Sequence, residues 1–100
     1  MTYIEAVADE IYRRLPAGSP MPDGDRRLYL IYAVLALTVG EQVTREDVHN
    51  AWAAWMAIQG RPHAALQPFL DLPAAEQERD EPFRKAIQEV ARMHARQQRR

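Results

Sequence analysis

One stretch of the chain is apolar around its whole circumference if it is wound into a helix. From residue 25 to residue 40 the sequence reads DRRLYLIYAVLALTVG, and its apolar residues leave no continuous polar face. Such a helix is stable only where other elements surround it. The apolar run from Leu28 to Val39 is also too short to span a bilayer. The sequence therefore predicts an all-α fold with this segment as the central helix, ending at Gly40.

The first and last parts of the chain show the pattern of helices that bury one face. Apolar residues recur there at spacings of three and four. Thr2 and Glu5 have the spacing of a capping box, and the helix that they begin is expected to end near Pro16. Asp80 is expected to cap the last helix. Residues 92–100 form a basic end without acidic residues, which complements the helix dipole.

A third amphipathic helix is expected between Thr44 and Gly60. Thr44 is placed to cap it, with Asp47 at the third helical position, and Val43 can pack against Val48. The apolar face that follows includes both tryptophans of the chain. Glycine at the end suits a left-handed cap. This segment is therefore predicted as a complete helix with its own start and stop signals.

Proline-bearing segments separate these helices. Residues 16–24 and 61–72 are expected to be irregular, because proline removes amide donors and glycine favours turns. The apolar residues expected to pack from the second segment onto the helices are Leu66, Phe69, Leu70 and Leu72. Pro73 suits the first turn of a short helix over Ala74–Arg79. The overall prediction is a single domain over residues 1–100, a compact bundle of four main helices plus one short helix.

Size and charge limit what the chain can bind. A chain of 100 residues buries only about 60–65% of its surface on folding, so a shared site between copies is attractive and a homo-oligomer is expected. A net charge of -1 gives no general attraction to nucleic acid or membranes. Without cysteine or a signal-like start, we expect a cytoplasmic protein with no membrane contact, in the host cytoplasm if it is phage-encoded.

The residue types needed for catalysis are sparse or poorly placed. The one serine, Ser19, lies in a Gly-Pro loop, and there is no cysteine. The acidic residues Glu76, Glu78, Asp80 and Glu81 are expected to stay ionised on a solvated face. No histidine pair has zinc-site spacing, and no glycine motif cradles a phosphate. We therefore predict a non-enzymatic protein without a metal or cofactor.

One group of residues is a candidate binding site. His49, Trp52 and Trp55 lie on the third predicted helix, and Arg61 and His63 follow it closely. Tryptophans are costly to bury, and they can stack on a flat ligand. Helix-spaced aromatics equally fit a core, and a neutral His49 bonded to a loop carbonyl equally explains that histidine. Both interpretations stay open at the level of sequence.

The order of residues around this group resembles the ryanodine-receptor-type (RyR) repeat. The matching positions are VHNAW at 48–52, Gly60, His63, Leu66, QPF at 67–69, Leu72, Glu76 and Asp80, so that the resemblance covers about residues 48–87 and extends to about residue 91 as a helical segment. The chain departs from the family pattern at Met56, where the family usually has lysine. It also has Arg61-Pro62 where the family has an aromatic-rich turn.

The resemblance suggests a function. RyR-type domains in prokaryotes are proposed to sense nucleotide-derived signals in conflict systems. The whole chain is also similar to small actinobacteriophage proteins of uncharacterised function with a VH-x-AW-x-x-W segment. Together these likenesses imply a phage protein that binds a nucleotide or cyclic nucleotide in phage-host conflict. Trp52 or Trp55 would stack on the base, and His49, His63 and Arg61 would face phosphate or ribose.

Two other functions fit the same sequence. The aromatic group, or the apolar run over residues 28–37, could meet a host protein or a second copy in a protein-interaction module. The helix start at residues 44–48 and the basic end are also typical of helix-turn-helix DNA-binding proteins. Against DNA binding, the third helix offers bulky Trp52 and Trp55 and mostly alanine where base-reading donors are needed. Nucleic acid is therefore the least favoured partner.

Overall fold

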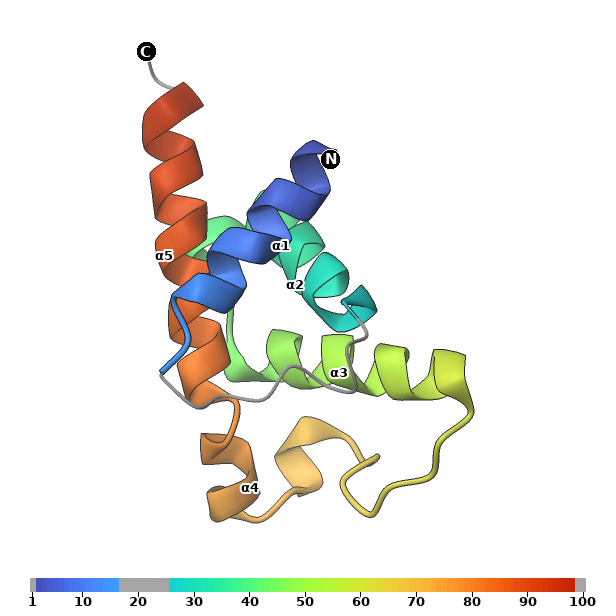
Figure 1. The fold of residues 1–100 in the computed structure, drawn as a ribbon. Helices are drawn as coiled ribbons and strands as arrows, with labels where there is room; N and C mark the ends of the chain where they lie inside the picture. The colour runs from blue at the N-terminus through green and yellow to red at the C-terminus, as the bar shows by residue number, and fades with distance from the viewer. Residues whose placement is uncertain (1, 17–25, 99–100) are drawn as a thin grey trace.

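The computed structural model describes residues 2–16 and 26–98. All regular structure in these residues is helical, which confirms the predicted all-α fold (Figure 1). The elements in chain order are α1 (Tyr3–Arg13), α2 (Arg27–Thr38), the 3-10 turn η2 (Gly40–Gln42), α3 (Arg45–Gln59), the 3-10 turn η3 (Phe69–Asp71), α4 (Ala74–Glu78) and α5 (Glu81–Gln98). The four longer helices and the short α4 match the prediction, whereas both 3-10 turns were not predicted. None of the described helices is long and apolar enough to cross a bilayer.

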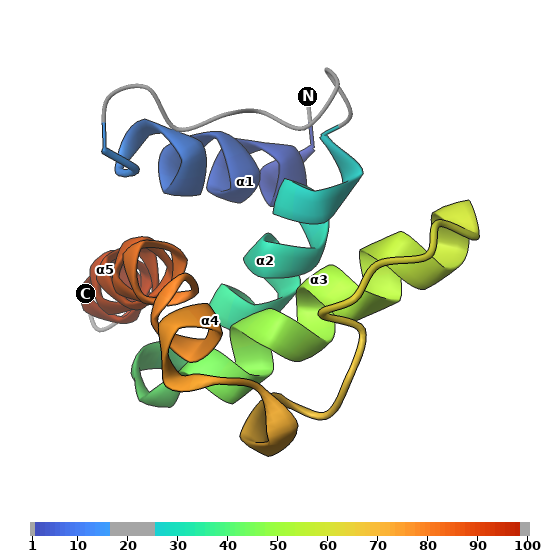
Figure 2. The same ribbon diagram turned by 90° about the horizontal axis from the view of Figure 1, so that it is seen from below.

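Helix α2 lies at the centre of the molecule, as its sequence predicts. It contacts α1, α3 and α5, and Figure 2, which looks almost along α5, shows it between α1 and α3. Its fully buried residues are Leu28, Tyr29, Tyr32, Ala33 and Ala36. The expectation that every side is covered is wrong, since Val34 and Leu37 remain 45% and 36% exposed. The other helices cover only part of its circumference and leave its C-terminal half open on one side.

The predicted helix ends are confirmed where they can be compared. The Thr2 hydroxyl accepts a hydrogen bond from the Glu5 amide, and the Glu5 carboxylate accepts one from the Thr2 amide. Thr44 and Asp47 form the same reciprocal pair at the start of α3, at 3.1 and 2.9 Å. Gly60 ends α3 with a φ of 66°, a left-handed conformation that glycine adopts at little cost. These caps determine where α3 begins and where the chain leaves it.

The segment after α3 runs back beneath that helix before it reaches α4 (Figure 1). It is irregular apart from η3, as predicted. Phe69 and Leu72 are buried, as expected, but Leu66 and Leu70 are 37% and 77% exposed. The expectation that all four residues pack inward is therefore wrong, because the tight turn of η3 buries Phe69 and directs its neighbour Leu70 to solvent.

Some sequence predictions concern residues outside the described part of the chain. The proline-bearing loop predicted over residues 16–24 falls there apart from Pro16. Ser19, Asp25 and the last two residues of the basic end also lie outside the described ranges. Within the described residues, α5 continues to Gln98 and so includes most of the basic end.

Candidate functional site

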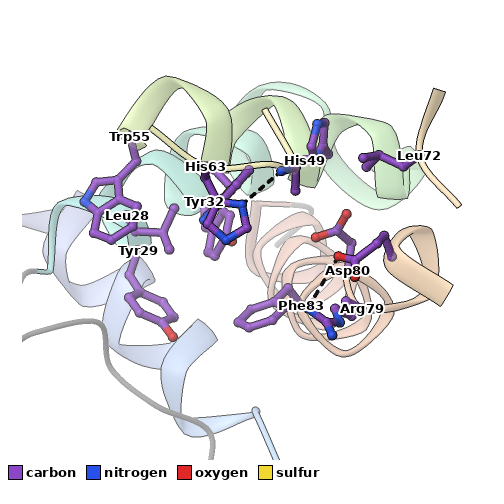
Figure 3. A pocket seen from close by; sticks show the side chains of 13 residues that line it. Leu28, Tyr29, Tyr32, His49, Trp55, His63, Leu72, Arg79, Asp80 and Phe83 are labelled. Carbon is purple, nitrogen blue, oxygen red and sulfur yellow. Dashed lines mark hydrogen bonds and ion pairs between the residues drawn. The ribbon is translucent and has the colours of Figure 1, made fainter. Parts of the chain in front are cut away.

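A pocket of about 280 Å³ opens between α2, α3 and the α4–α5 segment (Figure 3). Seven rings line it, from Tyr29, Tyr32, His49, Trp52, Trp55, His63 and Phe83. Figure 3 shows Trp55, His63 and His49 along one side, with Tyr29 and Phe83 along the other. Four of the five predicted site residues therefore line one cavity, although the sequence separates them by a helix end and a loop.

His49 is buried and holds the loop against α3. It is 4% exposed, and its Nε2 lies 2.7 Å from the Gln67 carbonyl oxygen. Because a carbonyl can only accept, Nε2 must carry the proton and donate it. The His49 ring also packs on Phe69, with 6.0 Å between ring centroids. The structural interpretation of this histidine is thus confirmed: one ring nitrogen is used to position the loop.

The two tryptophans have different environments. Trp55 is only 3% exposed and belongs mainly to the core, whereas Trp52 is partly exposed. The Trp52 ring contacts two imidazoles. Its centroid lies 5.7 Å from that of the His49 ring and 5.2 Å from that of the His63 ring. Trp52 therefore offers the larger accessible aromatic surface to a molecule in the pocket.

His63 completes the aromatic wall at the exposed edge. Its Nδ1 accepts a hydrogen bond from the Ala65 amide at 3.0 Å. A nitrogen that accepts carries no proton, so the proton of the neutral ring is on Nε2, which is then a donor. The ring stands perpendicular to Trp52. His63 can therefore donate a hydrogen bond to a ligand while its backbone contact fixes its orientation.

Arg61 is placed differently from the other predicted site residues. Its guanidinium carbon lies 5.7 Å from the ring centroid of Trp55, in cation-π geometry. It also contacts the Gln59 side chain at 3.4 Å. Arg61 is not among the described residues that line the pocket. Arg61 therefore contacts Trp55 but lies outside the pocket that the other four residues line.

The structure adds residues that the sequence interpretation missed. Tyr32, Phe83, Glu76, Arg79 and Asp80 all line the pocket. The Tyr32 and Phe83 rings contact each other, with 5.7 Å between their centroids. Tyr32 appears in the sequence only as one apolar position of the central helix. Glu76 and Asp80 appear there as positions of the RyR-like pattern and of a polar segment, but not as candidate site residues. Their common pocket depends on how α4 and α5 fold onto α2 and α3, which no local spacing signals.

Asp80 corrects the prediction that the acidic residues form a solvated face. Partial burial raises the pKa of its carboxyl group to about 6, an effect that the charge of Glu76 reinforces. Electrostatic interactions with His49 and Arg45 oppose the rise. At the start of α5, the backbone carbonyl of Asp80 accepts a hydrogen bond from the Arg84 amide at 2.9 Å. Asp80 directly precedes α5, at the predicted cap position, and it also lines the pocket.

The neighbouring acidic residues are engaged in ion pairs. Glu76 lies 3.4 Å from Arg79. Glu81 accepts hydrogen bonds from Arg84 and Arg45 at 2.7 and 2.9 Å, and these bonds lower the pKa of its carboxyl group to about 2. Two carboxylates and one guanidinium thus line the pocket, so its lining carries no excess of positive charge. Such a lining accepts N–H donors more readily than phosphate.

The described residues contain no group of three or more histidine or acidic side chains arranged to hold a metal ion. The pocket offers its rings, the donor of His63, the guanidinium of Arg79 and the carboxylates of Glu76 and Asp80. Flat rings with a few convergent polar groups are typical of sites that bind small organic molecules.

The family of the chain follows from its sequence as a whole. A model described as "Domain of unknown function (DUF7701)" matches residues 2–92. The chain belongs to the DUF7701 family. Residues 2–92 include α1 to α4 and most of α5, so the DUF7701 match contains every residue that lines the pocket. No curated protein and no solved structure matches the chain.

The raised pKa of Asp80 predicts a pH-dependent effect of Asp80→Asn on stability. The folded state binds the Asp80 proton more tightly than the unfolded chain does. The free energy of unfolding of the wild type therefore falls as pH rises from about 4 to about 6 and the carboxyl group ionises. The shift corresponds to at most about 3 kcal/mol, and the partial exposure of the group reduces the expected effect to about 1 kcal/mol. We expect Asp80→Asn to melt at the wild-type temperature at pH 4 and above it at pH 7.5.

Thermal melts monitored by circular dichroism measure this difference. Glu78→Gln is the matched control, because Glu78 is exposed on α4 and does not line the aromatic pocket. A difference between Asp80→Asn and wild type that is the same at both pH values would contradict the assignment of the raised pKa to Asp80.

Proposed function

We propose that this DUF7701 chain is a non-enzymatic binding protein whose pocket takes the base of a nucleotide-derived small molecule. The observation that carries the proposal is the aromatic lining, in which the partly exposed Trp52 faces a cavity shared with Tyr32 and Phe83. Stacking between a base and an aromatic side chain contributes about 1–3 kcal/mol per base. A ring-lined cavity thus matches the chemistry of a flat heterocycle.

The size of the pocket suits a ligand of which only the base lies inside the pocket. Its volume of about 280 Å³ is near the lower end of about 300–1,000 Å³ for small-molecule sites. A base fits this volume better than a whole dinucleotide. The sugar and phosphate would then remain towards the exposed edge, where His63 carries an N–H donor.

The resemblance of residues 48–87 to the RyR repeat supports a nucleotide-derived signal as the ligand. The likeness to actinobacteriophage proteins suggests phage-host conflict as the setting. Of the residues proposed for binding, Trp52 is the stacking surface and His63 a donor at the edge. His49 acts by positioning the loop, since its Nε2 is bonded to Gln67. Trp55 supports the wall from the core.

DNA binding is less well supported than ligand binding. Arg45, at the start of α3, forms an ion pair with Glu81 at 2.9 Å. Arg92, in the basic end, forms one with Glu41 at the same distance. Both arginines are therefore already paired with acidic residues of other elements. This pairing reduces the charge that they could offer to phosphates.

Replacing Trp52 tests the proposed function. The chain has two tryptophans, so in a Trp55→Phe background the tryptophan fluorescence, excited selectively, comes from Trp52 alone. We expect nucleoside monophosphates to quench this fluorescence. Trp52→Ala, in the wild-type background, should weaken their binding by about 10-fold or more in calorimetric titrations, because the stacking surface is lost.

Ile58→Ala is the control for Trp52→Ala. Ile58 is on the same helix and 65% exposed, and it does not line the pocket. It should therefore bind nucleotides as wild type does. Equal affinities for wild type, Trp52→Ala and Ile58→Ala would sink the proposal that the base stacks in this pocket.

Self-association is a second candidate, because α2 leaves an apolar face in solvent. Val34 and Leu37 of α2 are 45% and 36% exposed, and Val39, which follows the helix, is 40% exposed. A second copy that packed on this face would remove these side chains from water. The same face would suit a host protein. This function uses a different surface from the pocket, so the two proposals are compatible.

Sedimentation velocity distinguishes the self-association proposal from a monomer. We expect the wild type to form a dimer that Leu37→Glu dissociates, because a charge on this face opposes its burial. Ile58→Glu adds the same charge on an exposed part of α3 and should leave the dimer intact. A wild type that is monomeric at high micromolar concentration would rule out the α2 face as a self-association surface.

A further inference from the structure

The pocket holds one carboxylate whose neighbouring cations are engaged elsewhere. Asp80 lies between α4 and α5, and Figure 3 shows it near Phe83 and Arg79, across from His49. The described ion pairs of the nearby arginines are Arg79 with Glu76, at 3.4 Å, and Arg45 with Glu81, at 2.9 Å. A ligand with suitable donors would therefore meet an acceptor that these cations do not neutralise directly.

The polar chemistry at this end of the pocket favours donors on the ligand. An ionised carboxylate only accepts hydrogen bonds, and its two oxygens can accept two parallel ones. The electrostatic effect of Asp80 also reaches the buried Tyr32, whose pKa is raised by burial first and then by the charge of Asp80. An additional acceptor or anion here would be repelled. Phosphate is thus the wrong group for this position.

The rings define the shape of the group that carries those donors. Trp52, with His49 and His63 beside it, forms one wall, and Tyr32 with Phe83 contributes another. A flat heterocycle placed between these walls would present its edge to Asp80, which lines the same pocket. The walls and the carboxylate together therefore call for a planar ring with its donors on one edge.

We propose that Asp80 makes this a guanine-selective pocket, in which the carboxylate accepts hydrogen bonds from the N1–H and N2–H groups of the base. This inference rests on the proposed function and specifies its ligand. Guanine is the one standard base with two adjacent N–H donors on its edge. Adenine and cytosine place a ring acceptor beside their amino group, and uracil has a single N–H between two carbonyls. Each of these would direct a lone pair at Asp80.

The first test compares nucleosides on the wild-type chain by calorimetric titration at pH 7.5. Guanosine should bind about 10–100-fold more tightly than inosine, which lacks only the N2 amino group, because one bond to a charged acceptor is lost. Adenosine should bind at least as weakly as inosine. Choline serves as a probe for a different ligand class, since aromatic pockets with carboxylates also bind quaternary ammonium groups.

The second test exchanges the acceptor. Asp80→Asn replaces one acceptor with a donor, and xanthosine replaces the N2 amino group with a carbonyl oxygen. The amide therefore matches xanthosine, with its N1–H donor and O2 acceptor, as the carboxylate matches guanosine. We expect Asp80→Asn to reverse the preference, from guanosine in the wild type to xanthosine in the variant. Glu78→Gln, outside the pocket, should keep the wild-type ratio.

Each outcome separates this inference from the proposed function. Equal binding of guanosine, inosine and adenosine, with quenching of Trp52, overturns guanine selectivity and leaves base binding intact. A folded Asp80→Asn variant that keeps the wild-type ratio of guanosine to xanthosine also overturns it. Preferential binding of choline overturns both proposals, as does the absence of nucleoside binding to wild type. If Asp80→Asn does not fold, the guanosine and inosine comparison decides alone.

Discussion

The hydrogen bond from His49 to the Gln67 carbonyl is the contact on which the rest of the pocket depends. His49 is the one buried polar residue among those described, and its 2.7 Å bond satisfies a donor that would be costly to bury alone. The bond fixes the segment after α3 against that helix. Phe69 then packs on the imidazole. The chain is thereby directed beneath α3 towards α4 and Asp80.

The path of this segment explains how distant residues share one cavity. Trp52 is on α3, His63 is in the loop, and Phe83 is on α5, yet all three line the pocket. The central helix α2 supplies the inner wall through Tyr32, whose ring contacts that of Phe83 at 5.7 Å. The His49 bond and the aromatic contacts thus bring α3, the loop and α5 around the same space.

Asp80 brings a carboxylate into a pocket that is otherwise lined mainly by aromatic rings. A carboxylate beside aromatic rings costs stability, and its pKa of about 6 reflects that cost. Strongly perturbed groups in clefts concentrate at functional sites, because a binding or catalytic role requires them there. Every buried side-chain polar atom of the described residues has a hydrogen-bond partner, so the fold is otherwise well satisfied. The position of Asp80 in the pocket is the observation on which we base the proposed hydrogen bonds to a ligand.

The sequence predicts the helices well because their signals are local. Capping pairs such as Thr44 with Asp47, the left-handed Gly60 and the periodic apolar faces each depend on residues within a few positions. Residues 49–63 supply four of the aromatic lining residues and could be grouped from the sequence, whereas Tyr29, Tyr32 and Phe83 lie far from them along the chain. The sequence places Asp80 before the last helix, but its position in the pocket depends on the packing of α4 and α5 against other helices. The exposure of Leu70 likewise depends on a 3-10 turn without a clear sequence signal.

The most direct test of a base-binding pocket is to locate a bound nucleoside by nuclear Overhauser effects in solution. We expect contacts between the H8 and H1′ protons of guanosine and the ring protons of Trp52 and Phe83, which would place the base between the two aromatic walls. Contacts confined to the exposed α2 residues Val34 and Leu37, or none to the protein at saturating guanosine, would contradict the account.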